Sequence, residues 1–307
     1  MSKLITIAAT CLIAALGASR TAQSPPPATD IFLAPLKMQQ RRLVVGAPVN
    51  VTNRRGYDNQ PSFTTDSRAI LFTSVRADKQ ADIYHYNLTK KTTKSVTSTP
   101  ESEYSATVYG EGSRFSVIRV EADSTQRLWS FRIDGSDPRL VFPSIKPVGY
   151  HVWVDSTTVA MFLLGKPNAL VLADTRTGRA DTVARDVGRS LLQLPNGSGF
   201  SFLQHMSDSS WVLTAVDVRG SGRDRRTVPM PLVRMPPGAD YIAWLAPAIA
   251  ITGSGSKLSI WRGTDKASQW TDLVDLARYG LRHISRLALS PDHAWLAIVA
   301  EPAVEQP

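Results

Sequence analysis

The residue types that perform covalent catalysis are few in this chain, and their spacing matches no familiar catalytic set. The only cysteine is Cys11, near the start of the chain, so thiol catalysis has no candidate further along. The sequence contains no Gly-x-Ser-x-Gly nucleophile elbow. The segment "GSGSK" at 253–257 has neither that register nor the spacing of a phosphate-binding loop. We therefore expect neither a serine or cysteine hydrolase nor a nucleotide-binding loop.

The histidines are the remaining candidates for metal chemistry. None of them stands in a His-x-x-x-His pair or a similar ligand spacing, so a metal site would need ligands that converge from distant parts of the fold. We expect no metal and no cofactor. The five histidines are His85, His151, His205, His283 and His293.

Tyrosines with charged neighbours form a second set of candidates, suited to binding. They stand before apolar alternating segments that recur along the chain. Tyrosine combines a large apolar ring with a hydrogen-bonding hydroxyl, so it is common at recognition surfaces. We interpret the set as a partner-binding surface; the alternative is that the tyrosines pack between neighbouring elements. The set consists of Tyr57, Asp58, Glu103, Tyr104, Tyr150, His151, Arg189, Asp240, Tyr241 and His283.

The elements that must position these residues are β-strands, because apolar residues alternate with a period of two almost everywhere. Six segments share one plan: an apolar strand, a polar turn and a second apolar strand, followed by a third alternating strand. Their turns recur about every 40 to 50 residues, which indicates a repeat architecture. The first two strands of the six units, with the turn between them, lie at 61–74, 105–119, 151–164, 191–203, 241–254 and 286–300.

Four strands per unit and six units predict an all-β, six-bladed β-propeller over residues 29–307. The tyrosine set precedes the innermost strands, so we expect it to surround the mouth of the central channel on a concave, aromatic face. The sixth unit ends after its second strand at Glu301, whereas "DIFLAPL" (30–36) and "RRLVVGAPVNVT" (41–52) open the chain without earlier partners. We expect these N-terminal strands, 29–52, to complete the last blade with 285–301. This closure would remove two exposed sheet edges. In the fifth unit we interpret "WTDLVDL" as a fourth strand, although the leucines of 268–285 could also mimic a helix.

The segments "QPSFTTDSRAILFTS" (60–74) and "LALSPDHAWLAIVA" (287–300) carry a family resemblance. They resemble the Pro-x-Phe-Ser-Pro-Asp-Gly repeat of TolB-type, WD40-like propellers. The resemblance implies that Asp66 and Asp292 stabilise tight turns and that the propeller binds a partner in the cell envelope. We expect no α/β domain like that of TolB before the propeller, so the resemblance implies only the binding role of the propeller.

The first residues have the layout of a secretory signal peptide. Lys3 is followed by an apolar run at 4–16 and by the small residues 17–19. We expect a signal peptide at 1–22, a Pro-rich leader at 23–28, and residence in the periplasm or outside the cell. No other stretch is long and apolar enough to span a bilayer.

The formal net charge of +9 raises the question of nucleic-acid binding. Basic residues occur in short runs such as 39–42, 90–94 and 219–226, each at a predicted turn or strand edge. We interpret them as solvated turns and charged edges rather than as a nucleic-acid surface. The predicted function is a monomeric, non-catalytic propeller that binds a protein or peptide of the envelope. The alternative is a metal-dependent hydrolase or lyase acting on a small ester or sugar.

Overall fold

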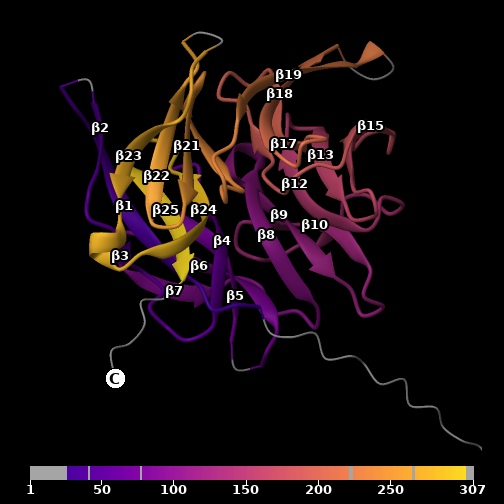
Figure 1. Ribbon diagram of the computed structural model, residues 1–307. Helices are drawn as coiled ribbons and strands as arrows, with labels where there is room; N and C mark the ends of the chain where they lie inside the picture. Colours follow the sequence, from indigo (N-terminus) through magenta and orange to yellow (C-terminus); the bar gives the residue numbers. More distant parts are fainter. Residues whose placement is uncertain (1–25, 41, 77, 221–223, 265–266, 302–307) are drawn as a thin grey trace, which may run out of the picture.

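The computed structural model describes residues 26–40, 42–76, 78–220, 224–264 and 267–301, and it shows six antiparallel sheets arranged in a ring (Figure 1). The predicted all-β, six-bladed propeller is therefore confirmed. The signal peptide predicted for 1–22 lies outside the described residues, as does the part of the Pro-rich leader up to residue 25.

The strands of the first five blades follow one another in the chain, with the first strand next to the axis. Blade 1 contains β4 (Tyr57–Phe63), β5 (Ala69–Val75), β6 (Ala81–Asn87) and β7 (Thr92–Ser95). Blade 2 contains β8 (Ser102–Tyr109), the short 3-10 helix η1 (Gly110–Gly112), β9 (Arg114–Val120), β10 (Gln126–Arg132) and β11 (Arg139–Leu140). Blade 3 contains β12 (Val148–Trp153), β13 (Thr158–Leu163), β14 (Ala169–Asp174) and β15 (Ala180–Arg185).

Blades 4 and 5 repeat the same order. Blade 4 contains β16 (Leu192–Gln193), β17 (Gly199–His205), β18 (Trp211–Arg219) and β19 (Arg226–Arg234). Blade 5 contains β20 (Ile242–Ala246), β21 (Ile249–Ser254), β22 (Lys257–Arg262) and β23 (Thr271–Asp275). The predicted fourth strand of the fifth unit is thus confirmed as β23, and the 3-10 helix η3 (Ala277–Tyr279) follows it.

Blade 6 joins the two ends of the chain. Its strands are β24 (Arg282–Leu289), β25 (Trp295–Glu301), β1 (Asp30–Gln39), β2 (Arg42–Val45) and β3 (Val49–Asn50). In the antiparallel pair of β1 and β25, Phe32 lies opposite Ile298 and Leu33 opposite Ala297. Figure 1 shows the indigo β1 beside the yellow strands of the C-terminal end. The predicted closure by N-terminal strands is confirmed.

The outer strand of blade 6 is interrupted. Both β2 and β3 pair with β1, and between them the Gly46 amide donates a hydrogen bond of 2.8 Å to the Pro35 carbonyl. A Cβ atom on Gly46 would lie 2.6 Å from Pro35 Cγ. Only glycine therefore fits where the chain approaches β1 so closely.

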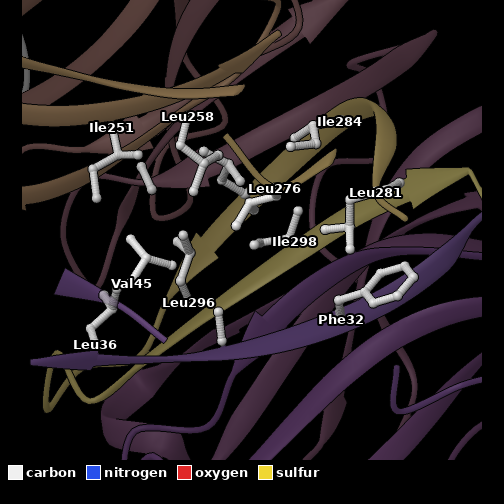
Figure 2. Packing of buried hydrophobic residues seen from close by; sticks show 14 of the residues in the cluster. Phe32, Leu36, Val45, Ile251, Leu258, Leu276, Leu281, Ile284, Leu296 and Ile298 are labelled. Atoms are coloured by element: carbon white, nitrogen blue, oxygen red, sulfur yellow. The ribbon is translucent and has the colours of Figure 1, made fainter. Parts of the chain in front are cut away.

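Six clusters of buried apolar side chains stabilise the described part of the ring, one between each pair of neighbouring blades. Figure 2 shows the cluster between blades 5 and 6, where Ile251 and Leu258 pack with Leu296 and Ile298. Because a middle strand packs against a blade on each side, both of its faces are buried. This explains the unbroken buried run from Ala69 to Ser74 in β5.

Aspartates lie in the turns that connect the first and second strands of blades 1 and 6, as the family resemblance implied. Asp66 Oδ1 accepts hydrogen bonds from Thr64 Oγ1 at 2.6 Å and from the Arg68 amide at 3.0 Å. Asp292 Oδ1 accepts the equivalent bonds from Ser290 Oγ and the Ala294 amide. The turn role of both aspartates is confirmed, since each carboxylate satisfies backbone donors within its own turn.

The basic turn at 219–226 is not solvated throughout, and the expectation is wrong for Arg225. Arg225 Nη2 lies 3.3 Å from Asp174 Oδ2 in blade 3, and the two side chains are only 7% and 2% exposed. Arg225 therefore links blades 3 and 4 through a buried ion pair. Over the described ranges, no helix combines the length and apolar character needed to cross a bilayer.

Candidate binding site in the central channel

An arginine from blade 6 crosses the central channel. Arg286 lies in the inner strand β24, and its Nη2 atom donates a hydrogen bond of 3.1 Å to the Tyr150 hydroxyl. Tyr150 lies in β12 of blade 3, which is opposite blade 6 in a ring of six blades. The side chains of Arg286 and Tyr150 therefore bridge the channel at this level.

A second tyrosine holds the guanidinium of Arg286 from one face. The Arg286 Cζ atom lies 4.0 Å from the ring centroid of Tyr241, which directly precedes β20, and 5.2 Å from that of Tyr150. A guanidinium over an aromatic face gains about 0.5–2 kcal/mol from the ring quadrupole. The cation is thus fixed in orientation by one hydrogen bond and two aromatic faces.

The two tyrosines have opposite pKa shifts. Burial by itself would raise the pKa of Tyr150, but the charges of Arg286 and Arg189 and a side-chain hydrogen bond from Tyr241 together hold it below its ordinary value. Burial raises the pKa of Tyr241. Arg189 acts on both hydroxyls, so the second arginine is also near the pair.

A cavity of about 370 Å³ extends along the inner strands from this level. All six blades contribute to its wall, with Gln60–Phe63 of β4, Ser105–Thr107 of β8 and Arg286–Leu289 of β24 among the lining segments. The segments of β4 and β24 are the carboxyl halves of their strands, and Pro291 beyond β24 also lines the cavity, so on blades 1 and 6 it extends toward the face that bears the turn aspartates. On blades 4 and 5 the lining lies at the amino ends of the inner strands, where the aromatic hollow was expected.

Four of the ten predicted site residues line this cavity: Tyr150, His151, Arg189 and Tyr241. Arg189 is exposed, whereas His151 is buried. The cavity wall thus includes two arginines and two tyrosines, together with hydroxyl and amide side chains from other blades.

The two predicted carboxylates that lie deepest are held in ion pairs away from the cavity. Asp58 Oδ2 lies 3.0 Å from Arg54 Nε, and Glu103 Oε1 accepts a hydrogen bond of 3.0 Å from Arg119 Nε. Both carboxylates are fully buried, and burial raises the pKa of each. Their position corrects the expectation that they project into the channel mouth. Arg119 also lies over the Trp129 ring at 4.3 Å.

The other four predicted residues lie outside the cavity wall. Tyr57 lines a second hollow with Arg54 and Arg76. Burial raises its pKa to about 12, and the charges of Arg286 and Tyr150 also act on its hydroxyl, so Tyr57 borders the channel cluster. Tyr104 is half-buried and lies close enough to Tyr57 to contribute to that rise. Asp240 is exposed. His283 is exposed and its Nδ1 atom lies 2.6 Å from Glu301 Oε2.

His151 is a neutral polar group in the wall. Its Nε2 atom lies 2.6 Å from Ser116 Oγ, which also accepts a hydrogen bond from Trp153 Nε1 at 2.9 Å. Burial lowers the pKa of His151 to about 3. Its Nδ1 atom has no hydrogen-bond partner among the described residues. Because no carboxylate orients this ring, the Ser116–His151 pair lacks the third member of a catalytic triad.

The chemistry of the cavity wall does not suit a divalent cation. Within the ranges that the structure covers, no three His, Cys, Asp or Glu side chains lie close enough to hold a metal ion. The wall of the cavity contains two arginines and no Asp or Glu. Hard cations need oxygen ligands with negative charge, and neighbouring guanidinium groups oppose their binding.

Arg286 was absent from the predicted set, although the sequence contains a signal for it. The first positions of the six aligned units are Pro61, Ser105, His151, Leu191, Tyr241 and Arg286. Arg286 is the one residue among them with a permanent charge. A permanent charge at the start of an inner strand, where the other units have apolar, small or aromatic residues or a histidine, was the signal available for it.

The fold and the channel define the class of this protein as a six-bladed β-propeller. A TolB candidate from Agrobacterium tumefaciens has a similar structure, with 14% identity, a TM-score of 0.66, and coverage of 90% of this chain and 99% of its own. TolB from Acinetobacter baumannii has 13% identity and a TM-score of 0.57 over 89% of this chain, which spans 64% of that protein. A gluconolactonase from Xanthomonas campestris has 11% identity and a TM-score of 0.62, with coverage of 92% of this chain and 99% of its own.

At these identities the likeness shows the fold alone. No model of a known protein family matches the chain. No curated protein matches it either. The propeller predicted from the repeat resemblance is confirmed, and both TolB proteins and an enzyme occur among its structural neighbours.

Proposed function

We propose that this protein is an exported, non-catalytic propeller that binds a protein or peptide partner of the cell envelope in its central channel. The observation that carries the proposal is the cavity of about 370 Å³, which has Tyr150, Tyr241 and Arg286 in its wall. Aromatic and arginine side chains in a partly enclosed site are the usual anchors of a protein interface.

Export, and with it periplasmic or extracellular residence, depends on the leader proposed for 1–22. The TolB-like fold supports an envelope role, since two of its structural neighbours are TolB proteins by description. We also propose that the protein is a monomer and that it does not bind nucleic acid.

The competing function was a metal-dependent hydrolase or lyase for a small ester or sugar. The gluconolactonase neighbour makes this function worth testing, but the arginine-rich cavity wall disfavours it. Elemental analysis of the purified mature protein separates the two functions. One tightly bound metal ion per chain would favour the enzyme.

Affinity capture from an envelope extract tests the proposed function. The double variant Tyr150→Ala with Tyr241→Ala should lose more than tenfold in affinity for the captured partner, which is about 1.4 kcal/mol. Tyr104 is left unchanged because it does not line the cavity. The matched control is Tyr279→Ala, since Tyr279 is 37% exposed and lies in η3, outside the cavity. Equal capture by the double variant and the control would refute a channel interface.

A further inference from the structure

The positive charge in the channel has no neutralising carboxylate. Neither Arg189 nor Arg286 forms an ion pair with Asp or Glu in the part of the chain that the structure describes. The contrast with other arginines is clear: Arg54, Arg119 and Arg225 each face a buried carboxylate. Arg286 is half-buried in the channel and Arg189 is exposed, so both charges remain available to an anion that enters it.

The hydrogen-bond inventory leaves donors for a ligand. A guanidinium has five N–H donors, and Arg286 uses one of them, on Tyr150. The Tyr150 oxygen accepts this bond, which leaves its own O–H group to donate to a ligand. The site therefore offers several donors and no charged acceptor.

From this arrangement we propose that the channel is a carboxylate-binding site, in which Arg286 and Arg189 receive a carboxylate of the peptide partner and the Tyr150 hydroxyl donates to the same group. This inference rests on the proposed function and specifies its ligand chemistry. A guanidinium matches a carboxylate with two parallel hydrogen bonds, which gives both energy and orientation.

The site is organised before the ligand arrives. Tyr241 stacks against Arg286 at 4.0 Å and Tyr150 fixes its end, so little side-chain entropy is lost on binding. The cavity volume of about 370 Å³ is near the lower end of the range for small-ligand sites. It suits one acidic side chain or a chain end. Leu192 and Trp244 in the wall provide apolar surface for the adjoining atoms.

The carboxylate has two sources in a peptide, namely the C-terminus and an Asp or Glu side chain. Three short acetylated peptides separate them: Ac-Ala-Ala-Leu with a free carboxylate, the same peptide as an amide, and Ac-Ala-Glu-Leu as an amide. Binding to the full-length mature protein is measured by calorimetry at constant ionic strength, with acetate and inorganic phosphate as small-anion probes.

We expect the peptides that carry a carboxylate to bind at least tenfold more tightly than the neutral amide, and the tighter of the two identifies the source. Arg286→Met should remove this preference. Arg189→Met should weaken it severalfold, and it serves as a second variant because Arg189 is exposed and its loss does not disturb the core. The matched control is Arg219→Met, whose side chain is 74% exposed in blade 4.

The proposal is overturned if the neutral amide binds as tightly as the acids, if the Arg286 variant retains the preference, or if no carboxylate peptide binds. If inorganic phosphate binds more tightly than acetate, the ligand group is a phosphate and the carboxylate proposal is wrong. Failure of the proposed function is distinguishable: a captured envelope partner that binds wild type and Arg286→Met equally leaves that function intact and removes the carboxylate site.

Discussion

Ile31 and Phe32 are adjacent in β1, yet their side chains lie in two different cores. Ile31 belongs to the cluster between blades 6 and 1, and Phe32 to the cluster between blades 5 and 6. Strand β1 is not an edge strand of its sheet, because β25 pairs with one side of it and the outer strands β2 and β3 pair with the other. The N-terminal segment therefore stabilises both interfaces of the blade that closes the ring.

Removing either side chain should destabilise the whole propeller. Ile31→Ala is expected to lower the free energy of unfolding by about 2–5 kcal/mol and Phe32→Ala by about 3–5 kcal/mol, because each leaves a cavity in a closed core. Met38→Ala on the same strand is the control, since Met38 is 65% exposed. Denaturant unfolding measures the three values. If neither core variant lowers the free energy of unfolding, the side chains of β1 do not stabilise the two interfaces of blade 6.

Arg225 should contribute to stability more than its place in a basic turn suggests. Arg225→Ala leaves the buried Asp174 with only the exposed Arg176 as an ion-pair partner, so we expect a loss of about 1–3 kcal/mol. Arg226→Ala, which removes an exposed neighbour, should change stability by less than about 0.5 kcal/mol. Thermal unfolding of both variants checks the difference. Equal melting temperatures would show that the link between blades 3 and 4 is not stabilising.

Replacing Arg286 should not lower the free energy of unfolding, in contrast to replacing Arg225. Because Arg286 is half-buried without a carboxylate partner, Arg286→Met removes a partly desolvated charge at the cost of one hydrogen bond and the stacking on Tyr241. We expect the free energy of unfolding to stay level or to rise, as is usual when an interior ion is replaced by an apolar side chain of similar volume. Calorimetry of the unliganded protein measures it. A loss above about 2 kcal/mol would make Arg286 a structural residue rather than a ligand-binding one.

His151 gives a pH dependence of defined sign. Its pKa is about 3 in the folded protein and 6.5 as the ordinary value, so the unfolded chain binds a proton that the folded chain does not bind between these limits. Above pH 6.5 the free energy of unfolding is unaffected by His151. As the pH falls toward 3, protonation of the unfolded chain lowers this free energy, with a slope of up to about 1.4 kcal/mol per pH unit.

The variant His151→Gln should remove this decline, whereas His293→Gln on an exposed turn should keep it. Asp58 and Glu103 have raised pKa values and act in the opposite direction, but both variants retain them. The difference between the two variants therefore isolates His151. Parallel stability curves for the two variants from pH 7 to pH 4 would refute the assignment.

The fold could be predicted from the sequence because its determinants are local and repeated. Turn aspartates such as Asp66 and Asp292 bond within their own turns, and the alternating strands recur at a regular interval. The incomplete sixth unit also predicted the pairing of β1 with β25. The location of the channel followed from the repeat, which is why Tyr150 and Tyr241 were identified.

The rest of the site depends on distances across the ring, which no local pattern specifies. Arg286 reaches Tyr150, a residue 136 positions away, because the width of the channel brings blades 3 and 6 within reach. The contact of Glu103 is local by comparison: Arg119 lies directly opposite it in the antiparallel pair of β8 and β9 and donates a hydrogen bond to its Oε1 atom. Alternation assigns Arg119 to a strand, but it does not show which side chains the arginine will meet.

Photo-cross-linking tests the central claim, that a partner binds inside the channel, most directly. A benzoylphenylalanine is placed at Thr107, which lines the cavity, or at Thr92, which is exposed on the outermost strand of blade 1. After illumination in envelope extract, the account predicts a covalent adduct with a protein or peptide from position 107 and none from position 92, and a lower yield when Arg286→Met is added. Adducts only from position 92, or no adduct from position 107, would contradict it, whereas equal yields with and without Arg286 would remove only the carboxylate site.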